Sequence, residues 1–146
     1  MKLFNRKSGL EKDILKSHKW IMQTLNTSGY KVDYTVESFK EIDRFFEENV
    51  INGQPVSGGL LATDTGSRLF ALGAFIGETI IRVCGGDWIL IDRDKYGEIN
   101  ITVKLDNGTI LFPVKRCIKR FKNGSQDGIY IYGYLISDVK RKRNSL

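Results

Sequence analysis

A short acidic run offers the most direct candidate for a metal site. Residues 92–99 read Asp-Arg-Asp-Lys-Tyr-Gly-Glu-Ile and match positions 1, 3, 6 and 8 of a calcium-binding EF-hand loop. Tyr96 stands at position 5, where Asp or Asn is usual, and Val103 stands at position 12, where a bidentate Glu is needed. The run therefore predicts a polar loop between two strands, and we expect no metal site there.

The single histidine is the first candidate for acid–base catalysis. His18 lies between Ile14 and Ile21 beside the apolar side of an expected helix, and a catalytic histidine needs a nucleophile or an orienting carboxylate. The sequence names no such partner, so we predict a packing role for His18. The chain also has no GxSxG, P-loop, GxGxxG or HExxH motif, and one histidine assembles none of the usual His/Cys zinc sites. We therefore expect no catalytic residues, no metal and no cofactor.

Glu78 is the second candidate, because it interrupts a strongly apolar segment. It lies four residues before Arg82, which favours an ion pair along one helix. The alternative is a partly buried carboxylate that caps loop amides or meets a ligand. An enzyme built on this glutamate would need Asp64 or Asp87 as a second carboxylate, and we expect that reading to fail. Trp88, just after the double glycine, is predicted to anchor the helix to a sheet, with its N–H seeking an acceptor.

Basic side chains gather near the C-terminal end of the sequence. They are Lys115, Arg116, Lys119, Arg120, Lys122, Lys140, Arg141, Lys142 and Arg143. Such a group is able to bind the phosphates of nucleic acid or another anionic surface non-specifically. No DNA- or RNA-binding signature accompanies it, so a solvated helix face followed by a solubilising tail is favoured.

The net charge of +6 is unevenly distributed. Residues 1–31 hold seven basic and two acidic side chains, residues 32–113 hold seven and thirteen, and residues 114–146 hold nine and two. The middle of the chain is therefore acidic, which favours a basic protein partner there. The residues predicted to bind it are Glu37, Glu41, Glu47, Glu48, Asp92, Asp94 and Tyr96.

Apolar spacing places three helices in the first part of the chain. Ser8 and Glu11 form a capping box, so a helix is predicted to begin at Gly9 and to end near Asn26. Thr35 is expected to cap a second helix over 36–49, and breakers make 50–67 a loop. A third, largely buried helix is predicted from about Thr65 to Cys84. Gly73 and Gly77 share one face of it and are expected to let another backbone approach.

The period then changes from 3.6 to 2, which predicts strands over 87–92 and 98–105. Asn107-Gly108 favours a tight type I′ hairpin. That turn would pair Leu105 with Ile110 and Val103 with Phe112, so that one apolar face continues through it. The predicted fold is α+β, with a three-stranded antiparallel β-meander packed against four to five helices.

The remaining segments complete a single predicted domain over residues 8–138. Pro113 to Asn123 is expected to be a helix closed by Gly124. The composition of residues 129–136 favours a strand, whereas the capping residue before them favours a helix. We favour the helix. Residues 1–7 are predicted to be frayed, and residues 139–146 to form a basic disordered tail.

Targeting signals, membrane spans and cysteine usage bear on the cellular compartment. The sequence shows no signal peptide and no segment long and apolar enough to span a membrane, so no membrane partner is expected. Cys84 and Cys117 are expected to be reduced thiols. These features predict a cytoplasmic protein.

One pattern resembles a known family. Leu72–Glu78 followed by Gly85–Trp88 is similar to the L-G-x-x-x-G-E … G-G-x-W signature of small bacterial domains of unknown function, and 37–43 resembles their E-S-x-x-x-I-D helix. The residues that carry the signature are Gly73, Gly77, Glu78, Gly86 and Trp88. The resemblance covers about 35–136 and implies a helix at 129–136.

Domains of this type occur among immunity and interaction proteins of bacterial toxin loci, so the resemblance implies binding rather than catalysis. We therefore predict a non-enzymatic protein-binding module, with an immunity-type partner of a toxin as its specific form. The alternative function is nucleic-acid or anionic-surface binding through residues 115–122 and 140–143.

Overall fold

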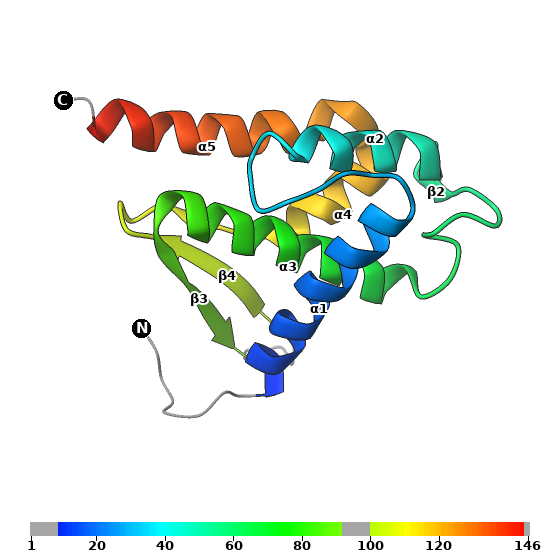
Figure 1. Ribbon diagram of the computed structural model, residues 1–146, viewed down its shortest axis with the longest axis horizontal. Helices are drawn as coiled ribbons and strands as arrows, with labels where there is room; N and C mark the ends of the chain where they lie inside the picture. Colours follow the sequence, from blue (N-terminus) through cyan, green and yellow to red (C-terminus); the bar gives the residue numbers. More distant parts are fainter. Residues whose placement is uncertain (1–8, 92–99, 145–146) are drawn as a thin grey trace.

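The computed structural model describes residues 9–91 and 100–144, and these form an α+β fold (Figure 1). It has five α-helices, a three-stranded antiparallel sheet and a separate two-stranded one. The elements in chain order are α1 Gly9–Thr27, α2 Phe39–Asn49, β1 Val50–Ile51, β2 Gln54–Pro55, α3 Thr65–Cys84, β3 Gly86–Ile91, β4 Asn100–Leu105, β5 Ile110–Leu111, α4 Pro113–Asn123, a 3-10 turn Gly124–Asp127, and α5 Ile129–Asn144. The predicted fold class is confirmed, although the β-structure is not a single meander.

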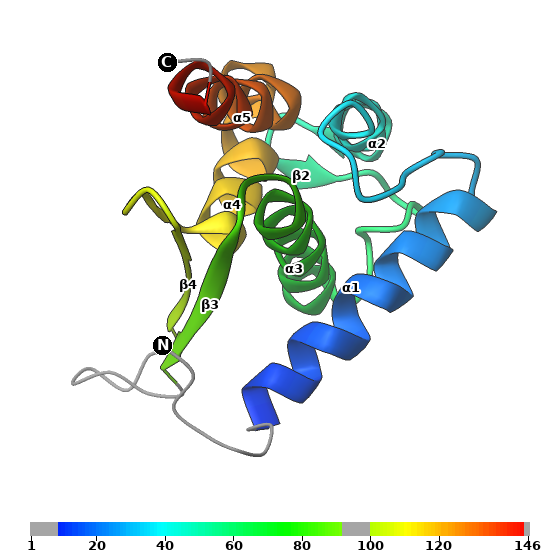
Figure 2. The ribbon, with the colours of Figure 1, turned by 60° about the vertical axis from the view of Figure 1, so that its left-hand side comes forward.

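Helix α3 lies at the centre of the molecule (Figure 2). The helices α1, α4 and α5 and the three-stranded sheet all contact it. Its apolar side chains account for this position, because Leu72, Phe75 and Ile76 are completely buried. At Gly73, an added Cβ would lie 2.6 Å from the Cα of Val114 at the start of α4. The glycine therefore allows the close backbone approach that the sequence predicted.

The hairpin between β4 and β5 differs from the predicted one by a single residue. Val103 pairs with Leu111 and Lys104 with Ile110. Gly108 has a φ of +91°, whereas Asn107 keeps a negative φ, so the type I′ turn, which needs positive φ at both residues, does not form. Residues 106–108 form a three-residue loop instead, in which the Leu105 N–H donates to the Thr109 carbonyl at 2.8 Å.

This register reverses the faces of the last strand. A shift of one residue moves every side chain of a strand to the opposite face. Leu111 therefore enters the core, while Ile110 and Phe112 are 46% and 42% exposed. The predicted pairs of Leu105 with Ile110 and of Val103 with Phe112 are wrong.

Helix boundaries follow the sequence closely, with two differences. Regular α2 begins at Phe39, because residues 35–38 form a turn in which the Ser38 N–H donates to the Thr35 hydroxyl at 3.3 Å. Helix α5 confirms the helix favoured at 129–136 and continues to Asn144, into the range predicted to be a disordered tail. The range predicted to be frayed, 1–7, lies outside the described residues.

Asp43 joins α2 to the start of α5. One of its carboxylate oxygens accepts the N–H of Ile129 and the other accepts the N–H of Tyr130, both at 2.9 Å. These are first-turn donors of α5, which have no acceptor inside the helix. The same carboxylate accepts Arg120 Nε at 3.0 Å, so one side chain links α2, α4 and α5. None of the helices within 9–91 and 100–144 is long and apolar enough to cross a membrane.

Candidate functional site

A pocket of about 360 Å³ lies between α1, α3 and β3, in the range of small-molecule sites. Figure 2 shows α3 with α1 on one side of it and β3 on the other. The pocket is lined by Glu11, Ile14, Leu15, His18, Glu78, Ile81, Gly86, Asp87, Trp88 and Leu90. Polar groups from all three elements therefore share one hollow with apolar side chains.

Glu78 forms the ion pair that the sequence favoured, and its other oxygen accepts a side-chain donor rather than loop amides. One carboxylate oxygen accepts Arg82 Nε at 3.0 Å, which is the expected ion pair along α3. The other oxygen accepts the indole N–H of Trp88 at 3.2 Å. The glutamate also lines the pocket, with 20% of its side chain exposed. Gly77 makes this arrangement feasible, because a Cβ there would collide with the Trp88 ring.

His18 is almost completely buried at the back of the pocket, which confirms its predicted packing role. Its Nδ1 shares a hydrogen bond of 2.8 Å with the Tyr34 hydroxyl. Burial lowers the pKa of His18, Glu78 acts in the opposite direction, and Arg82 adds to the lowering. The imidazole is therefore neutral near pH 7. The Arg82 guanidinium lies 3.6 Å from the centre of the Tyr34 ring and so covers one face of that ring.

The two aspartates considered as partners of Glu78 lie in different places. Asp87 lines the same pocket, while Asp64 lines a separate hollow beside Trp20 and Arg68. Within the described part of the chain, no group of three or more His, Cys, Asp or Glu side chains is placed to hold a metal ion. Both cysteines are buried and neither forms a disulfide with a described residue, and burial raises the pKa of Cys117 far above its ordinary range. A buried, protonated thiol of this kind is a poor nucleophile.

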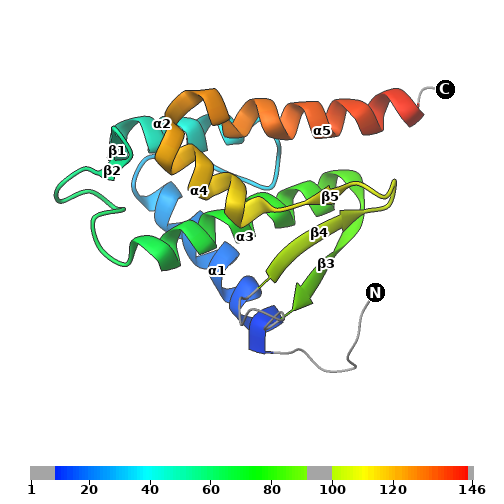
Figure 3. The same cartoon turned by 180° about the vertical axis from the view of Figure 1, so that it is seen from behind.

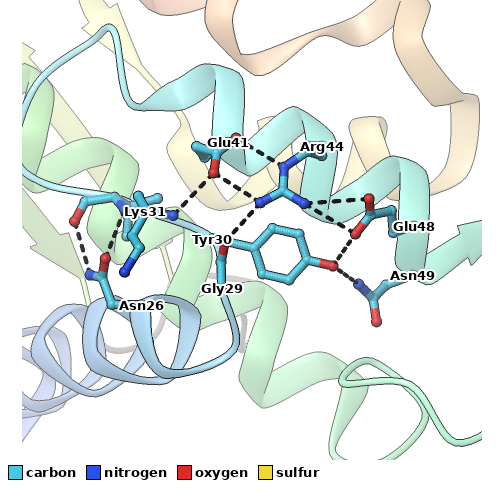
Figure 4. Close-up of polar contacts among 9 residues, drawn as sticks. Asn26, Gly29, Tyr30, Lys31, Glu41, Arg44, Glu48 and Asn49 are labelled. Carbon is cyan, nitrogen blue, oxygen red and sulfur yellow. Dashed lines mark hydrogen bonds and ion pairs between the residues drawn. The ribbon is translucent and has the colours of Figure 1, made fainter.

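The predicted acidic face of α2 is largely neutralised by neighbouring cations. Arg44 bonds to Glu41 at 2.9 Å and to Glu48 at 3.4 Å, and it also donates to the Gly29 carbonyl at 2.8 Å (Figure 4). The bond from Arg44 lowers the pKa of Glu41.

The other two glutamates are paired as well, Glu37 with Lys40 and Glu47 with Arg120. Asp92, Asp94 and Tyr96 lie outside the described residues. Glu41 also accepts the Lys31 N–H at 3.1 Å, so Glu41 and Glu47 fasten the segment after α1 and the end of α4 to α2.

The predicted basic group separates into buried and exposed members. Arg120 is only 3% exposed and pairs with Asp43, so the structure corrects its assignment to an anion-binding face. Arg116 pairs with Asp127 at 3.2 Å and covers the Tyr132 ring at 4.6 Å.

The exposed members of the group are lysines on α4. Lys115, Lys119 and Lys122 form no ion pair with another described residue. Residues 140–143 continue the backbone of α5, and their side chains lie outside the described set.

Exposed apolar side chains gather beside these lysines on β5 and α5, a surface that the sequence did not predict. Figure 3 shows β5, α4 and α5 on one side of the molecule. A hollow of about 230 Å³ between them is lined by Ile110, Leu111, Phe112, Lys115, Arg116, Lys119 and Tyr132. Leu135 and Val139 continue from Tyr132 along α5 at helical spacing, and both are more than half exposed. The β5–α5 surface is defined here as Ile110, Phe112, Tyr132, Leu135 and Val139.

No family model, curated protein or solved structure gives a significant match to the chain. The resemblance to the bacterial domains therefore stays a prediction. The proposed function therefore rests on the chain's own residues.

Proposed function

We propose that the chain is a non-enzymatic protein-binding module that holds its partner on the β5–α5 surface. The partner is a protein segment with apolar anchors flanked by Asp or Glu. The observation that carries the proposal is the 42% exposure of Phe112 at a hollow that Lys115 and Lys119 also line, with the 55% exposed Leu135 one helical turn beyond Tyr132 of the same hollow. Scattered exposed apolar residues are ordinary, whereas a contiguous group with a polar rim is typical of an interface.

The hollow gives the partner a place for an anchoring side chain. Phe112 and Tyr132 form aromatic walls, and aromatic residues in partly enclosed pockets carry much of the energy at protein interfaces. The ammonium of Lys115 lies 5.0 Å from the centre of the Phe112 ring. An apolar side chain that entered here would cover Phe112 and lie close to this charge.

Charge selects an acidic partner for this surface. Lys115 and Lys119 line the hollow without ion pairs to other described residues, so an incoming carboxylate would not have to displace an existing partner. The glutamates of α2 already have cationic partners. Electrostatic attraction therefore favours an acidic segment on β5–α5 over a basic one on α2.

Photocrosslinking locates the interface even while the partner is unidentified. A photoreactive amino acid is placed at Phe112, at Leu135, or at Ile51, which is 63% exposed on the separate two-stranded sheet. We expect one protein to be captured from the first two positions and not from the third. Equal capture at all three positions would remove the proposal.

The captured protein is then purified and its affinity measured. Phe112→Ser and Leu135→Ser are expected to raise the Kd at least tenfold, which corresponds to about 1.4 kcal/mol. Ile51→Ser is the matched control and should leave the Kd unchanged. All three side chains are exposed, so each variant is expected to fold, and circular dichroism checks this. An unchanged Kd in both test variants would contradict the proposed surface.

Nucleic-acid binding is the competing outcome, because Lys115, Lys119 and Lys122 are exposed cations on one helix. It predicts binding to DNA or RNA that falls steeply with salt, is weakened by Lys122→Ser, and is unaffected by Phe112→Ser. That combination would replace the protein-binding proposal.

A toxin is the specific partner that the family resemblance suggests, and this finer proposal has its own test. A toxin gene next to the gene for this chain would identify the candidate. Co-expression of the two should then restore growth, and the Phe112→Ser variant should fail to do so. Protection by that variant would separate the immunity role from the β5–α5 surface.

A further inference from the structure

The pocket between α1, α3 and β3 carries an excess of carboxylates over cations. Glu78 and Asp87 line it, and no lysine or arginine is among its described lining residues. Arg82 offsets part of the charge on Glu78, but the carboxylate has lone pairs beyond the two that Arg82 and Trp88 use. Asp87 is exposed, and its side chain forms no hydrogen bond or ion pair with another described residue. The pocket is therefore suited to a cation.

His18 supplies an independent polar group that points to a ligand. Its side chain is 98% buried, since only 2% is exposed, and its only hydrogen bond to the described residues is made by Nδ1. Every fully buried side-chain nitrogen of the described residues has a hydrogen-bond partner. His18 Nε2 has none among them, so this atom must reach accessible space, and the space that His18 lines is the pocket. The Tyr34 hydroxyl is able to accept from Nδ1, which leaves the Nε2 lone pair as an acceptor.

The apolar walls restrict the kind of cation. Ile14 and Leu15 of α1, Ile81 of α3 and Leu90 of β3 surround the polar groups, and Trp88 adds an aromatic ring. A hydrated metal ion would gain nothing from these walls, and the described acidic and imidazole side chains are not arranged to hold one. A cation with an aliphatic chain matches both parts of the pocket, because its methylenes are buried while its N–H groups meet acceptors.

We propose that this pocket binds an aliphatic primary ammonium group, with its nitrogen between His18 Nε2 and the Glu78 carboxylate, its methylenes against the apolar walls, and the exposed Asp87 adding negative charge to the lining. The site shares no lining residue with the β5–α5 surface. Ammonium binding in this pocket can therefore be tested independently of the proposed protein-binding function.

Proton NMR of the full chain with n-pentylamine at neutral pH tests the proposal. His18 is the only histidine in the chain, so its imidazole signals report directly on the pocket. We expect saturable shifts of the His18 ring signals and of the Trp88 indole N–H, with millimolar affinity for so small a ligand. Pentanol and pentanoate are matched in chain length, and we expect both to bind more weakly. Equal binding of pentanol, tighter binding of pentanoate, or no saturable shift would each overturn the proposal.

Asp87→Asn tests the carboxylate contribution without breaking an observed contact. We expect it to weaken pentylamine binding about three- to fivefold, as for the loss of one partly exposed charge pair. Asp64→Asn removes a carboxylate from the separate hollow beside Trp20 and should leave the affinity unchanged. Equal affinity of wild type and Asp87→Asn would overturn the claim that the negative charge of the pocket attracts the ammonium.

The ammonium has two chemical sources, which a second probe distinguishes. Nα-acetyl-lysine methylamide carries the same aliphatic ammonium on a peptide backbone. Binding comparable to that of pentylamine supports a lysine side chain of a polypeptide as the occupant. Exclusion of this probe while pentylamine binds supports a free small amine.

Discussion

Replacement of Asp43 by alanine is expected to lower the free energy of unfolding by about 3 kcal/mol. The Asp43 carboxylate accepts Arg120 Nε at 3.0 Å and the backbone N–H groups of Ile129 and Tyr130 at 2.9 Å. The Arg120 side chain is only 4% exposed, so its charge depends on neighbouring acceptors. Loss of this carboxylate would loosen the junction of α2, α4 and α5.

The magnitude follows from two costs and two offsetting effects. Removal of one partner of a buried ion pair costs about 3–5 kcal/mol, and loss of a helix-terminal acceptor costs about 1 kcal/mol. Two contacts reduce the effect, because Arg120 keeps the Asp43 backbone carbonyl at 3.2 Å and the Glu47 carboxylate at 3.5 Å. Asp43 is also 26% exposed, which lets water replace part of its role.

Urea denaturation followed by circular dichroism measures the change, with Asp13→Ala as the control for loss of an exposed helical aspartate. The control is expected to stay within about 0.5 kcal/mol of wild type. Arg120→Met and the double variant complete a thermodynamic cycle. We expect the double variant to be more stable than the sum of the single changes predicts, because no buried charge is left alone. A loss below about 1 kcal/mol in Asp43→Ala, or additive changes, would refute the reasoning.

Three further perturbations test other parts of the structure. Gly73→Ala should destabilise by about 1–3 kcal/mol in urea titrations because its Cβ would lie 2.6 Å from the Cα of Val114; Gly66→Ala, in the same helix with open space around it, should not, and equal effects would contradict this contact. Gly108→Ala should cost about 1 kcal/mol in the same assay because its φ is +91°, and an unchanged midpoint would argue against the three-residue loop. Burial lowers the pKa of His18, so the unfolded chain takes up that proton first and stability should fall as pH drops from 7 to 5. The melting temperature should depend less on pH over this range in His18→Phe, and an identical pH dependence in that variant would exclude His18 as the cause.

Local sequence patterns predicted the central helix well. The apolar run of α3 is too long for a strand, and the double glycine after it marks its C-terminal end. Gly73 was recognisable as a contact point because a glycine inside a helix requires a packing reason. Which element approached it, the start of α4, depends on tertiary packing that spacing does not encode.

The charged residues show where sequence reasoning is weaker. The i, i+4 pair of Glu78 and Arg82 was predicted because helical geometry makes it local. Arg120 was assigned to a solvated face, yet it is buried against Asp43, 77 residues earlier in the chain. A long-range partner of this kind leaves no periodic signal. The pocket behind Glu78 has the same origin, because α1, α3 and β3 meet only in the folded molecule.

The length of the loop between β4 and β5 connects the fold to the proposed function. In a two-residue turn, Ile110 and Phe112 would face the core opposite Leu105 and Val103. The observed three-residue loop instead buries Leu111 and turns both side chains outward, where Phe112 meets the lysines of α4. The apolar part of the β5–α5 surface is therefore a consequence of hairpin register. Deletion of one residue from 106–108 should favour the shorter turn, and with it the loss of partner binding while β4 and β5 remain paired.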